Sequence, residues 1–319
     1  MGVRLSLLVF LGAAMAIVGC RPPPADPPPA PEGLRDVYDL DGGDLHPEGM
    51  AFHSGERAFF FGSLNGGVVR RMEADGTQST AFDVGEEDWV TLGMRVHPTG
   101  PLVVCALHGF GGDAQNAQVW MIDPSTGERT RVVDLEPLQT GSGCNDVGFD
   151  ADGLVYVTDR ENPNLYRFAL DGPPELFRTD DELSSSILGL NGVDLSPDGD
   201  AMIVTRYLPA ALVRVPLDPQ EPVTRVDLDG DGFGTLPNGA DGMLRQGDDI
   251  LVAGHTRVLR FTSDDGWQTA TGVGTSPPEN IAALTVAEGT LYGLKGEVTN
   301  FVLGTDPDLP FRILALGLN

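Results

Sequence analysis

Four polar side chains at equivalent positions of a repeated segment are the strongest candidates for chemistry in this sequence. Two of them carry carboxylates and two carry amides: Glu48, Asn145, Asn191 and Asp241. Their oxygens are hard ligands that suit Ca²⁺, or Mg²⁺ and Mn²⁺ with added waters. The set lacks the His and Cys ligands that Zn²⁺ favours. If the repeats converge in space, these residues predict a divalent metal site, with calcium as the preferred ion.

The elements that must position these residues are six copies of one hairpin. Each copy alternates apolar and polar residues, turns at or near a glycine, and continues as a second apolar run, which is the pattern of two strands. The copies start 44, 53, 46, 50 and 41 residues apart, close to the period of propeller blades. They cover residues 48–62, 92–106, 145–159, 191–205, 241–254 and 282–294.

A second hairpin follows each copy, so that each repeat contains four predicted strands. These hairpins are expected at 68–84, 118–135, 165–180, 212–228, 257–273 and 298–316. We therefore predict an all-β chain, with residues 36–319 forming a six-bladed β-propeller; a β-sandwich or a β-helix is the alternative. Only residues 181–188 suggest helix, and there a single turn. The innermost strands of a propeller surround its axis, so the four polar residues would form a ring with Leu92 and Ala282.

Turn preference offers another explanation for part of this pattern. Asn-Gly and Asp-Gly are common turn dipeptides, and they begin the copies at Asn191 and Asp241. Polar residues in register in four copies, with Glu48 in a Pro-Glu-Gly context, are harder to obtain from turn preference alone. We therefore favour the metal ring over four unrelated turns.

Several of these motifs resemble the gluconolactonase/regucalcin (senescence marker protein) family over roughly residues 36–316. They are Pro-Glu-Gly at 47–49, Asn-Asp before a strand ending in Tyr-Val-Thr-Asp at 145–159, Leu-Asn-Gly ahead of Ser-Pro-Asp-Gly at 190–199, and Asp-Gly-Met at 241–243. The resemblance implies a six-bladed propeller with one metal on its axis and a hydrolase of lactones or related esters.

The resemblance also implies roles for individual residues. Glu48, Asn191 and Asp241 match the metal ligands, and Asn145 matches a residue that contacts the metal, a water or the substrate. Asp241 also matches the proposed general base, so Asp241 and Asn145 are the catalytic candidates. Sugar-lactone members tend to carry an Arg where this chain has Gly143, so we expect a substrate other than a sugar lactone. The absence of a nearby basic residue in the sequence points to a neutral or cationic ligand.

Charge and the N-terminal residues constrain the partners. The formal net charge of −27 repels phosphate backbones, so nucleic acid is not an expected partner. Residues 1–19 have the pattern of a lipoprotein signal peptide, with an apolar run too short to span a membrane, and Cys20 is the expected lipidation site. Residues 20–35 follow as the lipidated Cys and a stiff proline-rich linker. We expect an extracytoplasmic monomer anchored to the cell membrane, in a two-membrane cell the outer membrane facing the periplasm.

The remaining cysteines are Cys105 and Cys144. An oxidising compartment allows a bridge between them, and both are expected near the same rim of adjacent blades. We nevertheless expect two buried free thiols rather than a disulfide.

Three further features have a functional and a structural interpretation. Residues 227–232 resemble a calcium loop, but position 12 is Asn238 instead of Glu, so an acidic turn is favoured. His108 could act as a proton shuttle at the rim, and His46, two residues before Glu48, could have a rim role, although packing or surface roles are the more common ones for such residues. Asp159, at the end of a strand, is expected to cap a turn.

The sequence therefore predicts a metal-dependent hydrolase of a small-molecule lactone or ester on a lipid-anchored propeller. The alternative is a non-catalytic propeller that binds a ligand or a protein at the same axis. A third interpretation is a structural lipoprotein in which the ring only holds the blades together.

Overall fold

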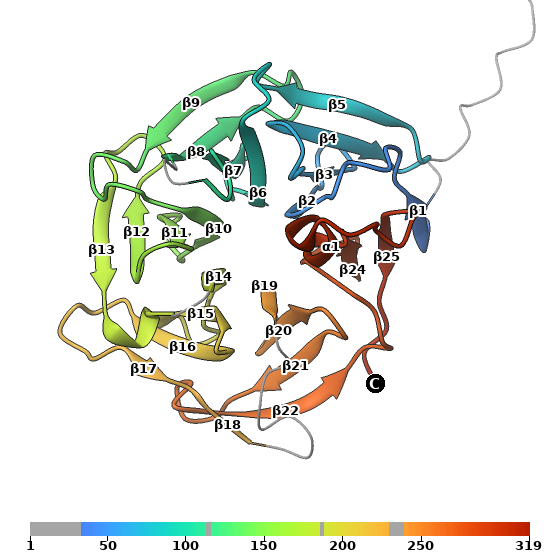
Figure 1. The fold of residues 1–319 in the computed structure, drawn as a ribbon. Coiled ribbons are helices and arrows are strands. Elements are labelled where there is room, and N and C mark those ends of the chain that lie inside the picture. The colour runs from blue at the N-terminus through green and yellow to red at the C-terminus, as the bar shows by residue number, and fades with distance from the viewer. Residues whose placement is uncertain (1–32, 113–115, 186–187, 230–238) are drawn as a thin grey trace, which may run out of the picture. The chain divides into compact units, whose positions relative to one another are not determined.

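The structure is a computed structural model, and it describes residues 33–112, 116–185, 188–229 and 239–319. Six sheets, antiparallel except for one added parallel strand, surround a central axis like the blades of a propeller (Figure 1). The predicted fold class, an all-β six-bladed propeller, is confirmed. Within the described residues no helix is long and apolar enough to cross a membrane. The chain segment that precedes residue 33, including Cys20, lies outside the described residues.

Each blade runs from an innermost to an outermost strand. Blade one contains β2 (Met50–His53), β3 (Ala58–Phe61), β4 (Val68–Glu73) and β5 (Gln78–Asp83). Blade two contains β6 (Trp89–Val96), β7 (Leu102–His108), β8 (Asn116–Ile122) and β9 (Arg129–Asp134). Blade three contains β10 (Cys144–Phe149), β11 (Val155–Asp159), β12 (Asn164–Phe168) and β13 (Glu175–Thr179).

The other three blades follow the same plan. Blade four contains β14 (Leu188–Leu195), β15 (Ala201–Leu208), β16 (Ala211–Pro216) and β17 (Thr224–Arg225). Blade five contains β19 (Ala240–Gln246), β20 (Asp249–Gly254), β21 (Leu259–Thr262) and β22 (Thr269–Thr275). Blade six contains β23 (Ala283–Ala287), β24 (Thr290–Lys295), β25 (Arg312–Ala315) and β1 (Val37–Asp39).

Burial explains why these residues form strands. The second strands are apolar on both sides because blades pack against both of their faces: all residues of β3 and of β11 are buried. The residues of the outermost strands are partly or largely exposed, as β5 and β13 show. The hydrophobic core is therefore divided into clusters between adjacent blades. One of them, between blades six and one, includes Tyr38, Phe59 and Phe311.

Blade six differs from the prediction. Residues 298–316 were expected to form a hairpin, but they form the short helix α1 (Val298–Leu303) followed by the single strand β25. Pro307 and Pro310, which lack the backbone N–H that a strand pairing needs, stand between them. The fourth strand comes from the other end of the chain, because β1 pairs antiparallel with β25 (Figure 1). The first strand of the chain thus closes the ring.

The junction of blades four and five also departs from a simple repeat. The segment predicted as the last strand of blade four is divided, because β17 completes blade four and β18 (Asp227–Asp229) pairs in parallel with β22 of blade five. The candidate calcium loop begins in β18, and its remainder, with Asn238, lies outside the described residues. The predicted helical turn after β13 is confirmed as the 3₁₀ turn η1 (Asp181–Leu183).

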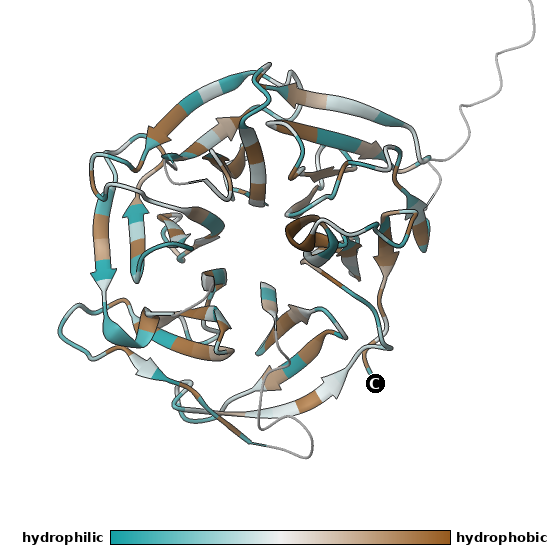
Figure 2. Cartoon of the chain, in the orientation of Figure 1, coloured by the Kyte–Doolittle hydropathy of each residue, from teal (hydrophilic) through white to brown (hydrophobic). Residues whose placement is uncertain are grey.

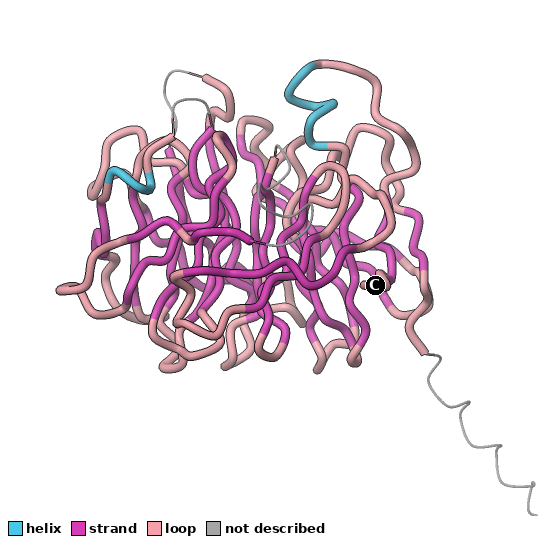
Figure 3. The backbone as a smooth tube through the Cα atoms, turned by 90° about the horizontal axis from the view of Figure 1, so that it is seen from below, coloured by secondary structure: helices cyan, strands magenta, loops and turns pink. Residues whose placement is uncertain are grey.

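The two helical segments lie at the same face of the disc, at the top in Figure 3. Helix α1 is short and largely hydrophobic, and it lies beside the centre of the ring (Figure 2). Its residues Val302 and Leu303 are 56% and 69% exposed. One face of the propeller therefore presents apolar side chains next to the axis.

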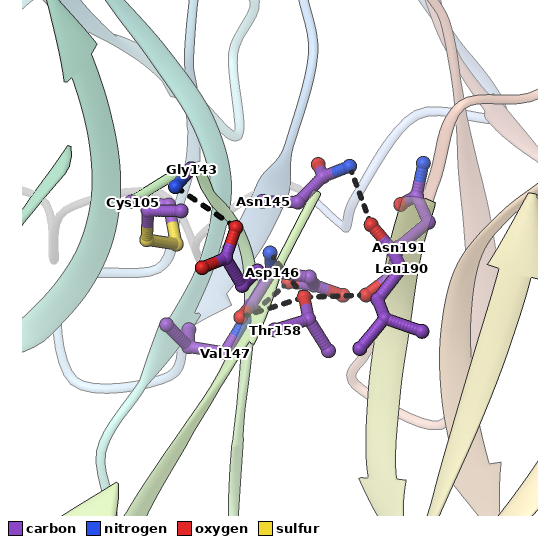
Figure 4. The surroundings of a disulfide bond; sticks show 10 residues. Cys105, Gly143, Asn145, Asp146, Val147, Thr158, Leu190 and Asn191 are labelled. Atoms are coloured by element: carbon purple, nitrogen blue, oxygen red, sulfur yellow. Dashed lines mark hydrogen bonds between the residues drawn. A yellow bond between two sulfur atoms is a disulfide. The ribbon is translucent and has the colours of Figure 1, made fainter. Parts of the chain in front are cut away.

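The expectation of two free thiols is wrong, because Cys105 and Cys144 form a disulfide (Figure 4). Cys105 lies in β7 and Cys144 in β10, on facing sides of adjacent blades, and both are fully buried. Their Cα atoms are 5.5 Å apart, within the range of about 4.4–6.8 Å that a bridge requires. The strand pattern placed both residues near one rim but could not show that their side chains face each other.

Candidate functional site

The four residues of the predicted ring line one cavity of about 260 Å³ on the propeller axis. Glu48 precedes β2, and the others lie in the innermost strands β10, β14 and β19. All four are buried, with 6%, 8%, 7% and 2% exposure for Glu48, Asn145, Asn191 and Asp241. The prediction that they converge is consistent with this geometry. Leu92 lines the same cavity, and Ala282 lines a smaller space directly beside it.

Local irregularities of the strands turn these side chains towards the axis. The strand pairing shifts between Cys144 and Val147, between Leu190 and Val193, and between Ala240 and Met243. Such a bulge adds a residue to one strand and re-aims the side chains at that point. Asn145, Asn191 and Asp241 lie inside these shifts, which explains how residues of regular-looking strands all reach one point.

The glycines that follow the ring residues serve close packing of the blades, not turns. A Cβ atom added at Gly192 would lie 2.5 Å from the backbone nitrogen of Met243, and one at Gly242 would lie 2.6 Å from the carbonyl oxygen of Ala282. The neighbouring innermost strands therefore approach closely only because these residues lack side chains. The Asn-Gly and Asp-Gly dipeptides belong to bulged strands, and the turn interpretation of them is wrong.

Threonines on the second strands fix the ring residues of the next blade. Thr158 Oγ1 of blade three donates to the carbonyl oxygen of Asn191 at 2.7 Å (Figure 4). Thr205 Oγ1 of blade four donates in the same way to the carbonyl oxygen of Asp241 at 2.9 Å. Asn145 Nδ2 donates to the carbonyl oxygen of Leu190 at 3.1 Å. Hydrogen bonds from one blade to the next therefore hold three of the four residues.

The two carboxyl groups lie in a strongly desolvated environment. Burial raises the pKa of Glu48 well above its ordinary value, and the charges of Asp241 and Asp146 add to this effect. Burial also raises the pKa of Asp241 to about 6, against the opposing influence of His255 and of a hydrogen bond from Asn191. Two negative charges buried in this cavity are unfavourable. Protonation of the carboxyl groups or binding of a cation would remove that free-energy cost.

The residues present fit a divalent cation. Glu48 Oε2 is buried and has no hydrogen-bond partner, and the bond that Asn145 Nδ2 donates leaves the side-chain oxygen as the coordinating atom of that amide. Two carboxylates and two amides give oxygen ligands of the type Ca²⁺ prefers. In the described part of the chain no three His, Cys, Asp or Glu side chains cluster as a metal site, so amide oxygens would have to complete this one.

The cavity wall also contains residues that lie outside the repeated pattern of the sequence. Arg160, directly after β11, lines the cavity, and its guanidinium carbon lies 4.4 Å from the ring centre of Phe110. The inference that no basic residue is near the site is therefore wrong. A Cβ atom at Gly143 would lie 2.7 Å from Arg160 Cγ, so Arg160 occupies the space beside Gly143. The backbone of Arg160 is held beside Gly143 by a 2.7 Å hydrogen bond from its N–H to the carbonyl oxygen of Gly143, a contact that the repeat pattern does not reveal.

An ion pair crosses the axis on the other side of the ring. Arg95 of blade two contacts Asp194 of blade four at 2.6 Å and also donates to the carbonyl oxygens of Val193 and Met243. Between this pair and the ring is a space of about 20 Å³ lined in part by Arg95 and Asp146, enough for about one water molecule. Burial raises the pKa of Asp146 to about 6, and the charge of Arg95 opposes the rise.

The two histidine candidates do not line the cavity. His46 is buried between Phe301 and Phe311, with 5.2 Å between ring centres on each side. His108 packs on Trp89 at the surface. Both therefore have packing roles. Asp159 caps the β11–β12 turn as predicted, because its carboxylate accepts from the backbone N–H groups of Gly143, Glu161 and Asn162.

Comparison with known proteins gives the same fold. The chain is similar to the major allergen Mala s 1 of Malassezia sympodialis, with 16% identity, a TM-score of 0.67, and coverage of 89% of this chain and 97% of the allergen. It is also similar to a gluconolactonase from Xanthomonas campestris, with 18% identity, a TM-score of 0.60, and coverage of 88% and 89%. The third is a calcium-binding protein, regucalcin, from Agrobacterium tumefaciens, with 15% identity, a TM-score of 0.61, and coverage of 89% and 95%.

At these identities the structural likeness establishes the fold alone. No curated protein sequence matches the chain. The family model for the SMP-30/gluconolactonase/LRE-like region matches residues 46–292, a span that begins just before Glu48 and includes all four ring residues. The chain therefore belongs to the SMP-30/gluconolactonase/LRE-like family.

Proposed function

We propose that this protein is a hydrolase of a lactone or related ester that depends on a divalent cation, with Ca²⁺ as the expected ion. The observation that carries the proposal is the pair of buried carboxyl groups, Glu48 and Asp241, in one axial cavity, with an oxygen of Glu48 that has no partner. Asn145 and Asn191 would complete the ligand set. Membership of a family that includes gluconolactonases supports the same activity.

The chain's own residues suit ester hydrolysis. When bound, a divalent cation supplies Lewis acidity that polarises a carbonyl group. The Asp241 carboxylate, buried in the cavity, can take a proton from the attacking water and return it to the departing alkoxide as the acyl–oxygen bond breaks. Asn145, fixed by Leu190, orients the substrate. The products are a carboxylate and an alcohol, and for a lactone both are on one molecule.

A calcium titration combined with turnover assays tests this proposal. After chelation, added Ca²⁺ should raise the melting temperature and restore hydrolysis of lactones and aryl esters. Asp241→Asn, Glu48→Gln and Asn191→Ala should lose the calcium-induced stabilisation, and Asp241→Asn should lower kcat by about 10²–10⁴-fold, as expected for a lost general base. Glu128→Gln, an exposed carboxylate in the β8–β9 turn, is the matched control and should behave as the wild type.

The outcomes separate the rival functions. Turnover unaffected by chelation and by Asp241→Asn contradicts the hydrolase mechanism. Calcium and ligand binding without any turnover identifies the alternative, a ligand-binding propeller. A melting temperature that responds to calcium with neither ligand binding nor turnover identifies a purely structural ion.

We also propose that the protein is an extracytoplasmic monomer anchored through a lipid on Cys20, in the outer membrane facing the periplasm where the cell has two membranes. The apolar run before Cys20 and the Cys105–Cys144 disulfide, which suits an oxidising compartment, support this. Cys20→Ser should move the protein from the membrane fraction to the soluble fraction and abolish incorporation of labelled palmitate. Unchanged fractionation would contradict the anchor. Sedimentation of the soluble form should give one chain, and no shift should appear with added DNA.

A further inference from the structure

The wall of the axial cavity is apolar except at two points. Apart from the ring itself, its side chains on the described residues are mainly aliphatic or aromatic: Leu64, Leu92, Phe110, Leu190, Val298 and Val302. The two polar exceptions are Arg160 and Tyr207. Val302 and Leu303 of α1 continue this apolar surface beyond the cavity, since both are exposed. A ligand that fills the cavity therefore contacts hydrocarbon over most of its surface.

Apart from the ring oxygens, which the proposed cation would occupy, the polar groups of the cavity leave few hydrogen bonds for a ligand. The Tyr207 hydroxyl is hydrogen-bonded to His255 Nε2, and His255 Nδ1 contacts Asn280 Oδ1 at 3.1 Å. Asn145 Nδ2 donates to the carbonyl oxygen of Leu190, and the side chain of Asn191 is directed to Asp241, whose pKa it lowers. A polyhydroxylated ligand would therefore bury hydroxyl groups without partners. Each such group lowers affinity by roughly 5- to 150-fold.

Arg160 is the exception, because within the described ranges none of its side-chain donors makes a hydrogen bond, although it forms an ion pair with Glu161. Its Nε lies 3.1 Å from Glu161 Oε1, yet without hydrogen-bond geometry, so that this buried nitrogen has no acceptor. Among the described residues neither Nη atom donates a hydrogen bond. The Phe110 ring supports the face of the guanidinium, which fixes its plane in the wall. A planar fork held in this way suits a carboxylate, which it can bind through two parallel hydrogen bonds.

We infer that the ligand of this cavity is a small amphiphilic lactone or ester with an aliphatic body and a carboxylate, not a polyhydroxylated sugar lactone. This rests on the proposed function for the ester group, which lies at the four ring residues. The aliphatic body lies against the leucines and α1, and the carboxylate pairs with Arg160. The volume of about 260 Å³ is just below the usual range for ligand pockets, about 300–1,000 Å³, so the ligand is small.

Binding of lactams, which resemble lactones but resist hydrolysis, tests this inference without turnover. Titration calorimetry in the presence of Ca²⁺ would compare four probes: δ-valerolactam, the same ring with a hexyl chain, the same ring with a chain of that length ending in a carboxylate, and gluconolactam. Each buried methylene should raise affinity by up to about fourfold. Both chain-bearing lactams should therefore bind at least tenfold more tightly than gluconolactam.

Variants isolate the role of Arg160. Arg160→Met should weaken the carboxylate probe at least tenfold and the hexyl probe less than threefold. Arg160→Lys, which keeps the charge but loses the fork, should fall between these values. Arg225→Met, an exposed arginine on β17, is the matched control and should change neither. A melting temperature for each variant establishes that it folds, and the comparison of probes on the wild type does not depend on any variant.

The results separate this inference from the proposed hydrolysis. Tighter binding of gluconolactam, or equal loss of both chain-bearing probes in Arg160→Met, overturns the inferred ligand class even if lactones are hydrolysed. The expected order of lactam affinities supports the ligand class even if the matching lactones are not hydrolysed, and in that case the proposed hydrolase function is the part that fails.

Discussion

Glu48 and Asp241 are buried acidic residues whose negative charges are unfavourable in the metal-free site. Two carboxyl groups lie in one desolvated cavity, and each has a raised pKa for which burial is the largest cause. The fold tolerates this because Thr205 and the bulge in β19 fix the backbone at Asp241. In the metal-free protein, ionisation of these groups therefore destabilises the folded state, and a bound cation would remove this destabilisation.

A pH dependence of stability follows for the metal-free protein. The pKa of Asp241 is about 6 when folded, against an ordinary value of 3.8, so the folded state binds the proton more tightly than the unfolded state. The contribution of this group to the free energy of unfolding therefore falls as the pH rises, by about 1.4 kcal/mol between pH 5 and pH 7.5. Urea unfolding in the presence of a chelator measures it.

Asp241→Asn removes this titration while leaving the other acidic residues in place. Between pH 5 and pH 7.5, the free energy of unfolding of the variant should fall by about 1.4 kcal/mol less than that of the wild type. An identical pH dependence in the two proteins would show that Asp241 has an ordinary pKa. Added Ca²⁺ should stabilise the wild type more at pH 7.5 than at pH 5, because protons compete with the cation for the carboxylates.

Single residues also show what sequence reasoning can reach. Glu48, Asn145, Asn191 and Asp241 could be selected because the repeat places them in register, and register survives in the sequence. Arg160 could not, because its approach to the axis depends on the turn after β11 and on the space that Gly143 leaves. Functional residues that do not occupy the repeated position of the six copies could therefore be identified only from the structure.

The second strands connect neighbouring blades through side-chain hydrogen bonds, and substitution of Thr158 tests this role. Its hydroxyl accepts from the backbone N–H of Asp146 at 3.0 Å and donates to the carbonyl oxygen of Asn191. Thr158→Val keeps the shape but leaves both buried groups without a partner, which should cost about 1–3 kcal/mol of unfolding free energy. The displaced Asn191 should also weaken calcium binding in a titration.

The same change on an outer strand provides the control. Thr130 is exposed on β9 and donates one hydrogen bond to the carbonyl oxygen of Met121. Thr130→Val should cost less than 0.5 kcal/mol, as is usual for surface substitutions, and leave calcium binding unchanged. Equal effects of the two changes would contradict a special role for Thr158.

The disulfide joins β7 to β10 and so links blades two and three. It closes a loop with a sequence separation of 39 residues, for which the chain-entropy model gives a stabilisation of about 4 kcal/mol. A Cys105→Ala and Cys144→Ala double variant should lose up to this amount in urea unfolding, and a reductant should destabilise the wild type but not the variant. Equal stability of the variant and the oxidised wild type would contradict this role of the bridge.

At the scale of the whole molecule, the repeat predicted the blades but not how the ring closes. The period and alternation of residues 48–294 are local properties, so they can be read without knowing the fold. The pairing of β1 with β25 joins residues from the two ends of the chain, and no local pattern indicates it. Residues 298–316 were misassigned because a short, mostly apolar segment such as Val298–Leu303 suits a strand and a short helix equally well.

Tyr38 of β1 contacts residues on both sides of the junction where the ring closes. Its ring is 2% exposed and lies 5.5 Å from Phe59 of blade one, while its hydroxyl donates to the carbonyl oxygen of Ala74 at 3.2 Å. Tyr38→Ala should cost about 3–5 kcal/mol, the range for large aromatic side chains in a core. Val37→Ala, at a neighbouring position that is 48% exposed, is the control and should cost little.

Hydrogen exchange should show that Tyr38→Ala speeds exchange first in β1, β25 and β24, because opening the ring at this seam frees blade six before the others. Uniform acceleration over all six blades would instead mean that the propeller unfolds as one unit and that the seam is no weaker than any other blade interface.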